Sequence, residues 1–128
     1  MTSMKRAAAW AALAALAAFA APGVAAADDA GAGAWKIDGM VEGKGFVITC
    51  HFDRKADALG GACFDGGTNL KHVLKAGAVT GDQVKWTYTS HYGVIPFDVT
   101  YAGKLAGGAM HGTIVAAGHN GTFSGAKQ

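Results

Sequence analysis

From Trp35 onward, short runs of β-forming residues alternate with glycine-containing turns at nearly regular spacing. No stretch of this region has the length or the end signals of a helix. Because the connecting turns are short, consecutive strands are expected to be antiparallel neighbours. The expected strands cover residues 35–41, 45–53, 59–65, 70–79, 84–92, 94–105, 109–117 and 122–127.

An open meander of eight strands would leave its first and last strands as exposed edges. Pairing these two strands with each other removes both edges. The sequence therefore predicts an all-β fold, an antiparallel up-and-down eight-stranded barrel.

Four hairpin turns are expected, at Ala56-Asp57, Tyr92-Gly93, Gly107-Gly108 and Asn120-Gly121. Each gives its hairpin one apolar face and one polar face. The second turn pairs Trp86 with Val99, and the fourth pairs Phe123 with Gly118. The expected interior residues are Phe46, Ile48, Phe52, Leu59, Val84, Trp86, Tyr88, Ile95, Phe97, Val99, Tyr101, Leu105, Met110, Ile114 and Phe123.

The strand at 70–79 admits two registers. A two-residue turn at Gly81-Asp82 directs Lys71 and Lys75 inward, and burial of unpaired lysines is costly. A three-residue turn that includes Gln83 is preferred for that reason. It directs inward Leu70, His72, Leu74 and Ala76.

Residues 1–27 have the order of a secretory signal peptide, with Lys5 and Arg6 before an apolar run and small residues at its end. The apolar run is shorter than the roughly 20 residues of a membrane span, although an uncleaved anchor helix is the alternative. We expect residues 28–34 to form a flexible leader and residues 35–128 a single domain. The mature form, without a membrane span, is expected in the periplasm or outside the cell.

The mature part contains nine Lys and Arg residues and nine Asp and Glu residues, so its net charge is near zero. This balance gives no electrostatic reason to expect a nucleic-acid partner. Cys50 and Cys63 are its two cysteines, and in an exported chain an even number is typical of a disulfide. A metal site is the alternative, but the spacing lacks the close Cys-x-x-Cys pair usual for zinc. The turn at Ala56-Asp57 places the two cysteines opposite each other.

The sequence contains no catalytic motif of the serine-hydrolase, zinc-protease or phosphate-loop kind, so neither an enzyme nor a cofactor is expected. Any site is expected at the barrel end near the turns at 92–93 and 120–121, where imidazoles and aromatic residues gather. The imidazoles there would hold a divalent metal or line a ligand mouth, or they are scattered surface residues. The candidate ligand-binding residues are His72, Trp86, Tyr88, His91, Tyr92, Tyr101 and His119.

The layout resembles the avidin and streptavidin type of barrel and, more loosely, the lipocalin class. The segments that carry the resemblance are Gly45-Phe46-Val47-Ile48-Thr49, Ala58-Leu59-Gly60-Gly61, His72-Val73-Leu74-Lys75-Ala76-Gly77 and Gly121-Thr122-Phe123. It implies a barrel that binds a small molecule. Avidins enclose biotin with several tryptophans and a polar set of Ser, Asn, Thr and Tyr residues, whereas the mature chain contains two tryptophans, Trp35 and Trp86, and its sequence does not place such a polar set.

The chain is also similar to small secreted barrels, with one disulfide, that inhibit bacterial proteases through an extended N-terminal segment. The leader at 28–34 would take that role. The first functional expectation is a periplasmic binding protein for a small hydrophobic or aromatic ligand. The alternatives are an inhibitor acting on a protein partner and a structural, envelope-associated protein.

We predict cleavage between Ala27 and Asp28, because small residues at 25 and 27 follow an apolar run broken by Pro22-Gly23. Intact-mass analysis of the exported protein should give a chain that begins at Asp28. A mature chain that retains Trp10 would contradict the prediction.

Overall fold

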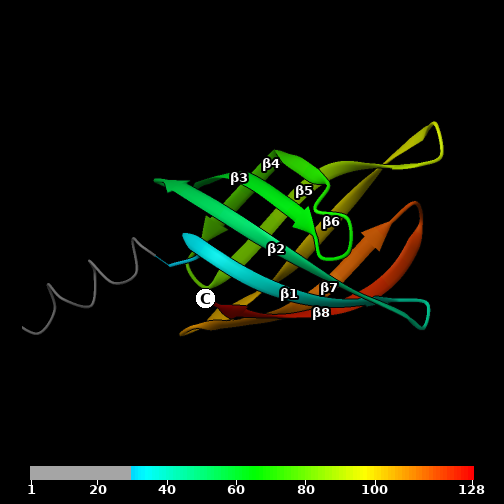
Figure 1. Ribbon diagram of the computed structural model, residues 1–128. Coiled ribbons are helices and arrows are strands. Elements are labelled where there is room, and N and C mark those ends of the chain that lie inside the picture. Colours follow the sequence, from blue (N-terminus) through cyan, green and yellow to red (C-terminus); the bar gives the residue numbers. More distant parts are fainter. Residues whose placement is uncertain (1–29) are drawn as a thin grey trace, which may run out of the picture.

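A computed structural model describes residues 30–128, and the signal peptide expected at residues 1–27 lies outside the described residues. Each strand pairs with its sequence neighbours, and the first also pairs with the last, so the sheet closes into an antiparallel barrel (Figure 1). The all-β fold is confirmed. Its strands are β1 (Gly33–Val41), β2 (Lys44–Lys55), β3 (Ala58–Asp65), β4 (Lys71–Thr80), β5 (Gln83–Tyr92), β6 (Ile95–Ala106), β7 (Ala109–Ala116) and β8 (His119–Lys127).

The two ends of the barrel differ. The β1–β2, β5–β6 and β7–β8 hairpins project from one end, which we call the open end (Figure 1). The chain enters β1 and leaves β8 at the other, closed end. There the Gln128 backbone N–H donates a hydrogen bond to the Ala34 carbonyl at 2.8 Å.

The closed end is covered by the segment just before β1. Gly31 is buried, and a Cβ atom added to it would lie 3.3 Å from Val79 and 3.6 Å from Leu105. The Trp35 indole N–H donates to the Gly31 carbonyl at 3.1 Å, and Arg54 donates to the Ala30 carbonyl at 2.8 Å. These hydrogen bonds hold the residues that precede β1 against the barrel. β1 itself begins at Gly33, two residues before the expected strand.

Aromatic rings fill the middle of the barrel. Trp86 and Tyr101 stack with ring centroids 4.6 Å apart, and Phe52 and Phe123 meet the Trp86 ring edge-on at 4.9 and 5.4 Å. Most of the expected interior set is buried or partly buried. Ile95 is an exception, because 63% of its surface is exposed beyond the end of the barrel.

The Cys50–Cys63 disulfide is confirmed. The two cysteines lie opposite each other on β2 and β3, as the turn at Ala56-Asp57 predicts, and both are fully buried. The turn at Gly107-Gly108 is confirmed in the same way, with Tyr101 opposite Ile114.

The predicted turn at Tyr92-Gly93 is wrong by one position. The chain turns at Gly93-Val94, so Trp86 faces Tyr101 rather than Val99, a slip of two residues along the partner strand. Outward pairs favour this register, since the Thr87 hydroxyl lies 2.9 Å from that of Thr100. A slip of two leaves the inward and outward faces unchanged.

The predicted turn at Asn120-Gly121 is also wrong. The chain turns at Ala117-Gly118, and Phe123 pairs with Gly112 instead of Gly118. A Cβ atom added to Gly125, which pairs with Met110, would lie 2.8 Å from the Met110 side chain. Large residues therefore face glycines across β7 and β8, and this interior packing prevails over the local turn preference of Asn-Gly.

Neither expected register of β4 holds along its whole length. The turn is the two-residue one at Gly81-Asp82, but the pairing with β5 is irregular between Leu74 and Ala76. Such a bulge reverses which residues face inward. His72 is therefore buried as preferred and Lys75 stays outside, whereas Leu70 and Ala76, which were expected inside, are exposed.

Residues 30–128 contain no helix long and apolar enough to span a membrane.

Neighbouring residues on β7 test the assignment of faces. Ile114 is fully buried, whereas 47% of Val115 is exposed. We expect Ile114→Ala to lower the free energy of unfolding by about 2–5 kcal/mol, because it empties space in a packed core. Val115→Ala should change it by less than about 1 kcal/mol. Urea unfolding of both variants measures the difference, and equal losses would show that β7 is turned the wrong way.

Candidate functional site

A hollow of about 650 Å³ opens at the open end, between the three projecting hairpins. We call it the mouth. Its lining is mostly apolar, with four charged or titratable groups among the lining residues, namely Glu42, Lys44, Tyr92 and His119. The lining residues are Val41, Glu42, Lys44, Gly45, Phe46, Tyr92, Phe97, Ala116, Ala117 and His119.

Two phenylalanines form the inner part of the mouth. Phe46 pairs with Gly39, and a Cβ atom at Gly39 would collide with the Phe46 ring. The glycine thus allows the ring to lie flat across β1. Phe97 comes from β6, and both rings are partly buried against the core. The inner surface of the mouth is therefore aromatic and continuous with the packed interior.

A contact between an imidazole and a carboxylate joins two of the hairpins at the rim. His119 Nδ1, at the start of β8, lies 2.9 Å from Glu42 Oε1 in the β1–β2 turn. Glu42 and Gly43 both have positive φ, 50° and 80°, as this tight turn requires. Lys44 adds a further charge to the same side of the rim. The mouth thus combines an apolar interior with a polar edge.

The β5–β6 hairpin carries exposed apolar side chains beyond the barrel. Tyr92 is 81% exposed, Val94 92% and Ile95 63%. Large apolar residues that gather on a protruding surface are typical of interaction sites.

A column of buried polar groups lies on the interior side of β3–β6. His72 Nε2 lies 3.1 Å from the Asp65 carboxylate, and its ring stacks on Tyr88 at 4.7 Å. The Tyr88 and Tyr101 hydroxyls are 2.8 Å apart, so one donates a hydrogen bond to the other. The Trp86 indole N–H is buried and has no hydrogen-bond partner among the described residues.

Burial makes both phenols hard to ionise. It raises the pKa of Tyr88 to about 12, although the hydrogen bond from Tyr101 opposes the rise. Burial and the nearby Tyr88 raise the pKa of Tyr101 further. Both hydroxyls therefore stay protonated at neutral pH and act as a neutral hydrogen-bonded pair.

The seven candidate ligand residues are divided between three places. Tyr92 and His119 line the mouth. His91 is exposed on β5 and does not line it. The remaining four are buried in the interior, namely His72, Trp86, Tyr88 and Tyr101.

The imidazoles of His72, His91 and His119 do not come together. Within residues 30–128, no three His, Cys, Asp or Glu side chains are grouped closely enough to hold a metal ion. Val41, Glu42 and Lys44 line the mouth but were not among the candidates. These three residues lie in or beside the β1–β2 turn, at the barrel end where a site was expected. That position in the sequence could have identified them.

Comparison with protein-family models, curated proteins and solved structures gives no match to this chain.

The buried phenols predict a loss of stability in alkali. Unfolding exposes both tyrosines, so their pKa values return toward 10.0. Above that pH the unfolded chain releases protons that the folded chain retains, and the free energy of unfolding falls. The contribution should be constant below about pH 10 and then fall by up to about 1.4 kcal/mol per pH unit for each phenol.

Urea unfolding between about pH 9 and pH 11 measures this slope. Tyr88→Phe removes one of the two phenols and should make the decline shallower. Tyr92→Phe is the matched control, because the Tyr92 side chain is largely exposed already. Equal slopes in wild-type and Tyr88→Phe proteins would show that Tyr88 does not titrate as a buried group.

Proposed function

We propose that this chain is an exported binding protein that holds a small hydrophobic or aromatic ligand in the mouth of its barrel. The observation that carries the proposal is the apolar hollow of about 650 Å³ at the open end. Ligand sites in proteins have volumes of about 300–1,000 Å³, are lined mainly by apolar and aromatic side chains, and contain a few polar groups. The mouth has this composition.

The location follows from how the rest of the barrel is used. The stacked rings of Trp86 and Tyr101 occupy the middle, and the segment around Gly31 covers the closed end. The open end is where a ligand finds both space and apolar surface. Avidin-like and lipocalin-like barrels, which the sequence resembles, also take ligands through one end of an eight-stranded barrel.

The lining indicates the chemistry of the ligand. Phe46, Phe97 and Tyr92 offer ring surfaces on which a planar apolar group would pack. The Glu42–His119 pair and Lys44 at the rim would contact a polar substituent that faces solvent. The ligand is therefore an aromatic or hydrophobic molecule with one hydrogen-bonding group.

Export is part of the proposal. The signal-peptide order of residues 1–27 and the buried Cys50–Cys63 disulfide both favour an oxidising compartment, the periplasm or the extracellular medium.

A protein partner is the second candidate, because Tyr92 and Val94 protrude as exposed apolar residues on one hairpin. A protease inhibitor of the kind expected from sequence would need a free extended segment, whereas Ala30 and Gly31 are held by hydrogen bonds. Inhibition of secreted bacterial proteases, lost on Val94→Asp, would favour this candidate over the first.

The neutral fluorophore N-phenyl-1-naphthylamine tests the mouth. We expect saturable binding of one molecule per chain, with a rise in fluorescence as the probe leaves water. Tyr92→Ala should weaken it about tenfold, the equivalent of about 1.4 kcal/mol. The Tyr92 ring lines the mouth but lies outside the core, so the variant should fold normally.

Two control variants distinguish the mouth from general adsorption. Val73→Ala removes an exposed apolar side chain from β4, and His91→Ala removes an exposed imidazole next to Tyr92. Neither residue lines the mouth, so both variants should bind like the wild type. Binding that does not saturate, or that Val73→Ala weakens as much as Tyr92→Ala does, would refute the proposal.

A further inference from the structure

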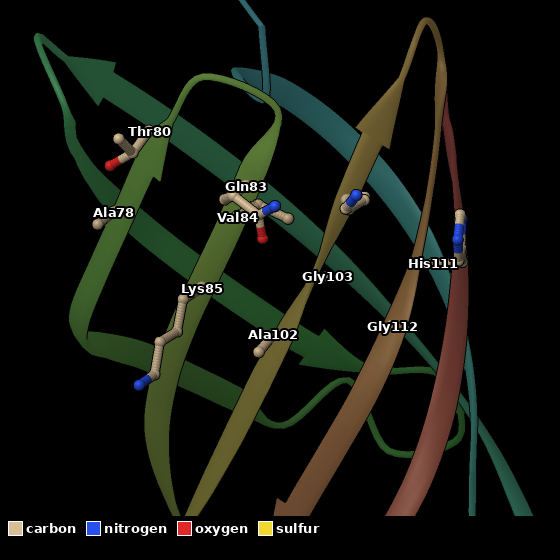
Figure 2. Close-up of a pocket in the computed structure, with 10 residues that line it drawn as sticks. Ala78, Thr80, Gln83, Val84, Lys85, Ala102, Gly103, His111 and Gly112 are labelled. Carbon is tan, nitrogen blue, oxygen red and sulfur yellow. The ribbon is translucent and has the colours of Figure 1, made fainter.

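A second hollow, of about 510 Å³, lies on the outer face of β4–β7 and shares no residue with the mouth (Figure 2). We propose that this outer hollow binds a small oxyanion, the phosphate or sulfate group of a free ester or of a lipid headgroup. The proposal is independent of the function assigned to the mouth.

The floor of the outer hollow is made of very small residues. Lys85 pairs with Ala78 on one side and with Ala102 on the other, so two methyl groups flank its base. Gly103 pairs with Gly112, and a Cβ atom added to Gly112 would collide with the Ala102 carbonyl oxygen. Gly103 and Gly112 stand at inward-facing positions, so the outer floor is formed by the short side chains of Ala78 and Ala102 and by the backbone of β6 and β7.

Basic side chains surround this floor. Lys104 pairs with Gln83 on β5 and with His111 on β7, which places an amide, an ammonium and an imidazole in one row across the sheet. Lys85 stands in the next row, diagonal to Lys104. Figure 2 shows Lys85 and His111 on opposite sides of the hollow, with Ala102 and Gly103 between them. An anion on the floor would thus have lysine ammonium groups and an imidazole around it.

These basic groups have no internal counter-ion. Lys75 on β4 contacts both carboxylate oxygens of Asp98 on β6, at 2.8 and 3.0 Å. Within residues 30–128, by contrast, Lys85, Lys104 and His111 form no ion pair and no side-chain hydrogen bond. Neighbouring like charges on adjacent strands repel each other. A bound anion would relieve this repulsion.

The geometry points to a compact, multiply charged group. Lysine ammonium groups bind phosphate as point charges, and Gln83 and Thr80 would donate further hydrogen bonds from the edge of the hollow. The alanine floor would accept the apolar part of an ester. Because the site is open to solvent, its affinity should fall as salt concentration rises.

Amide shifts in two-dimensional NMR, recorded at low salt, test the site with inorganic phosphate and phenyl phosphate as probes. We expect saturable shifts confined to residues around Gln83–Lys85, Ala102–Lys104 and His111, with phenyl phosphate the tighter ligand. The double variant Lys85→Gln/Lys104→Gln should weaken both probes about tenfold or more. Ala102→Leu, which fills the floor without changing charge, should weaken phenyl phosphate more than inorganic phosphate.

The double variant Lys36→Gln/Lys71→Gln is the matched control, because it removes the same charge from exposed lysines that do not line the hollow. Sedimentation with vesicles of phosphatidylglycerol, compared with phosphatidylcholine, separates the two sources. If the protein sediments with phosphatidylglycerol vesicles and this depends on Lys85 and Lys104, the ligand is a lipid headgroup. If it binds phenyl phosphate but does not sediment with the vesicles, the ligand is a free ester. Shifts that do not saturate, or an equal loss in the control variant, would overturn the proposal.

Discussion

Closure of the sheet is the constraint on which the rest of this structure depends. β1 pairs with β2 on one side and with β8 on the other, so every strand has two partners and no edge is left unpaired. In a closed ring the registers of all eight pairings must be mutually consistent. Ile37 shows the consequence, because it faces Ile48 across one pairing and Gly125 across the other. A large residue in the interior is thus accommodated by a glycine on the adjoining strand.

The same closure divides the barrel into a filled part and a hollow part. Aromatic rings packed around Trp86 fill the middle of the barrel, and the segment at Gly31 covers one end. Hairpins that extend past the barrel at the other end carry exposed side chains with no interior to enter, among them Tyr92 and Ile95. The mouth is therefore a result of unequal hairpin lengths rather than of a vacancy in the core.

Outside β4, the sequence was sufficient for the faces of the strands and for the registers of β2–β3 and β6–β7, but not for the registers of β5–β6 and β7–β8. Alternation has a period of two, so a slip by an even number of residues leaves the apolar pattern intact. Both register errors are of this kind, two residues in β5–β6 and six in β7–β8. What decides the registers is contact between strands, such as the hydroxyl pair of Thr87 and Thr100.

The bulge of β4 and the set of residues that line the mouth could not be predicted from the sequence, for related reasons. A bulge near Lys75 changes the phase of alternation inside one strand, which no regular pattern anticipates. Tyr92 and His119 were expected near the turns at one end of the barrel, and both line the mouth at that end. Whether a residue lines a hollow or lies beside it, as His91 does, depends on how far each hairpin projects.

The closed end has a practical consequence for how this molecule is attached to anything else. Residue 30 and residue 128 both lie there, and the Gln128–Ala34 hydrogen bond holds the two ends of the described segment side by side. A fusion partner, a tether or a sensor surface joined to either terminus would leave the projecting hairpins pointing away from the support. A short peptide bridging the termini would also allow circular permutation, with new ends cut into a turn. Immobilised chains would then all present the same end to solution, whichever terminus carries the linker.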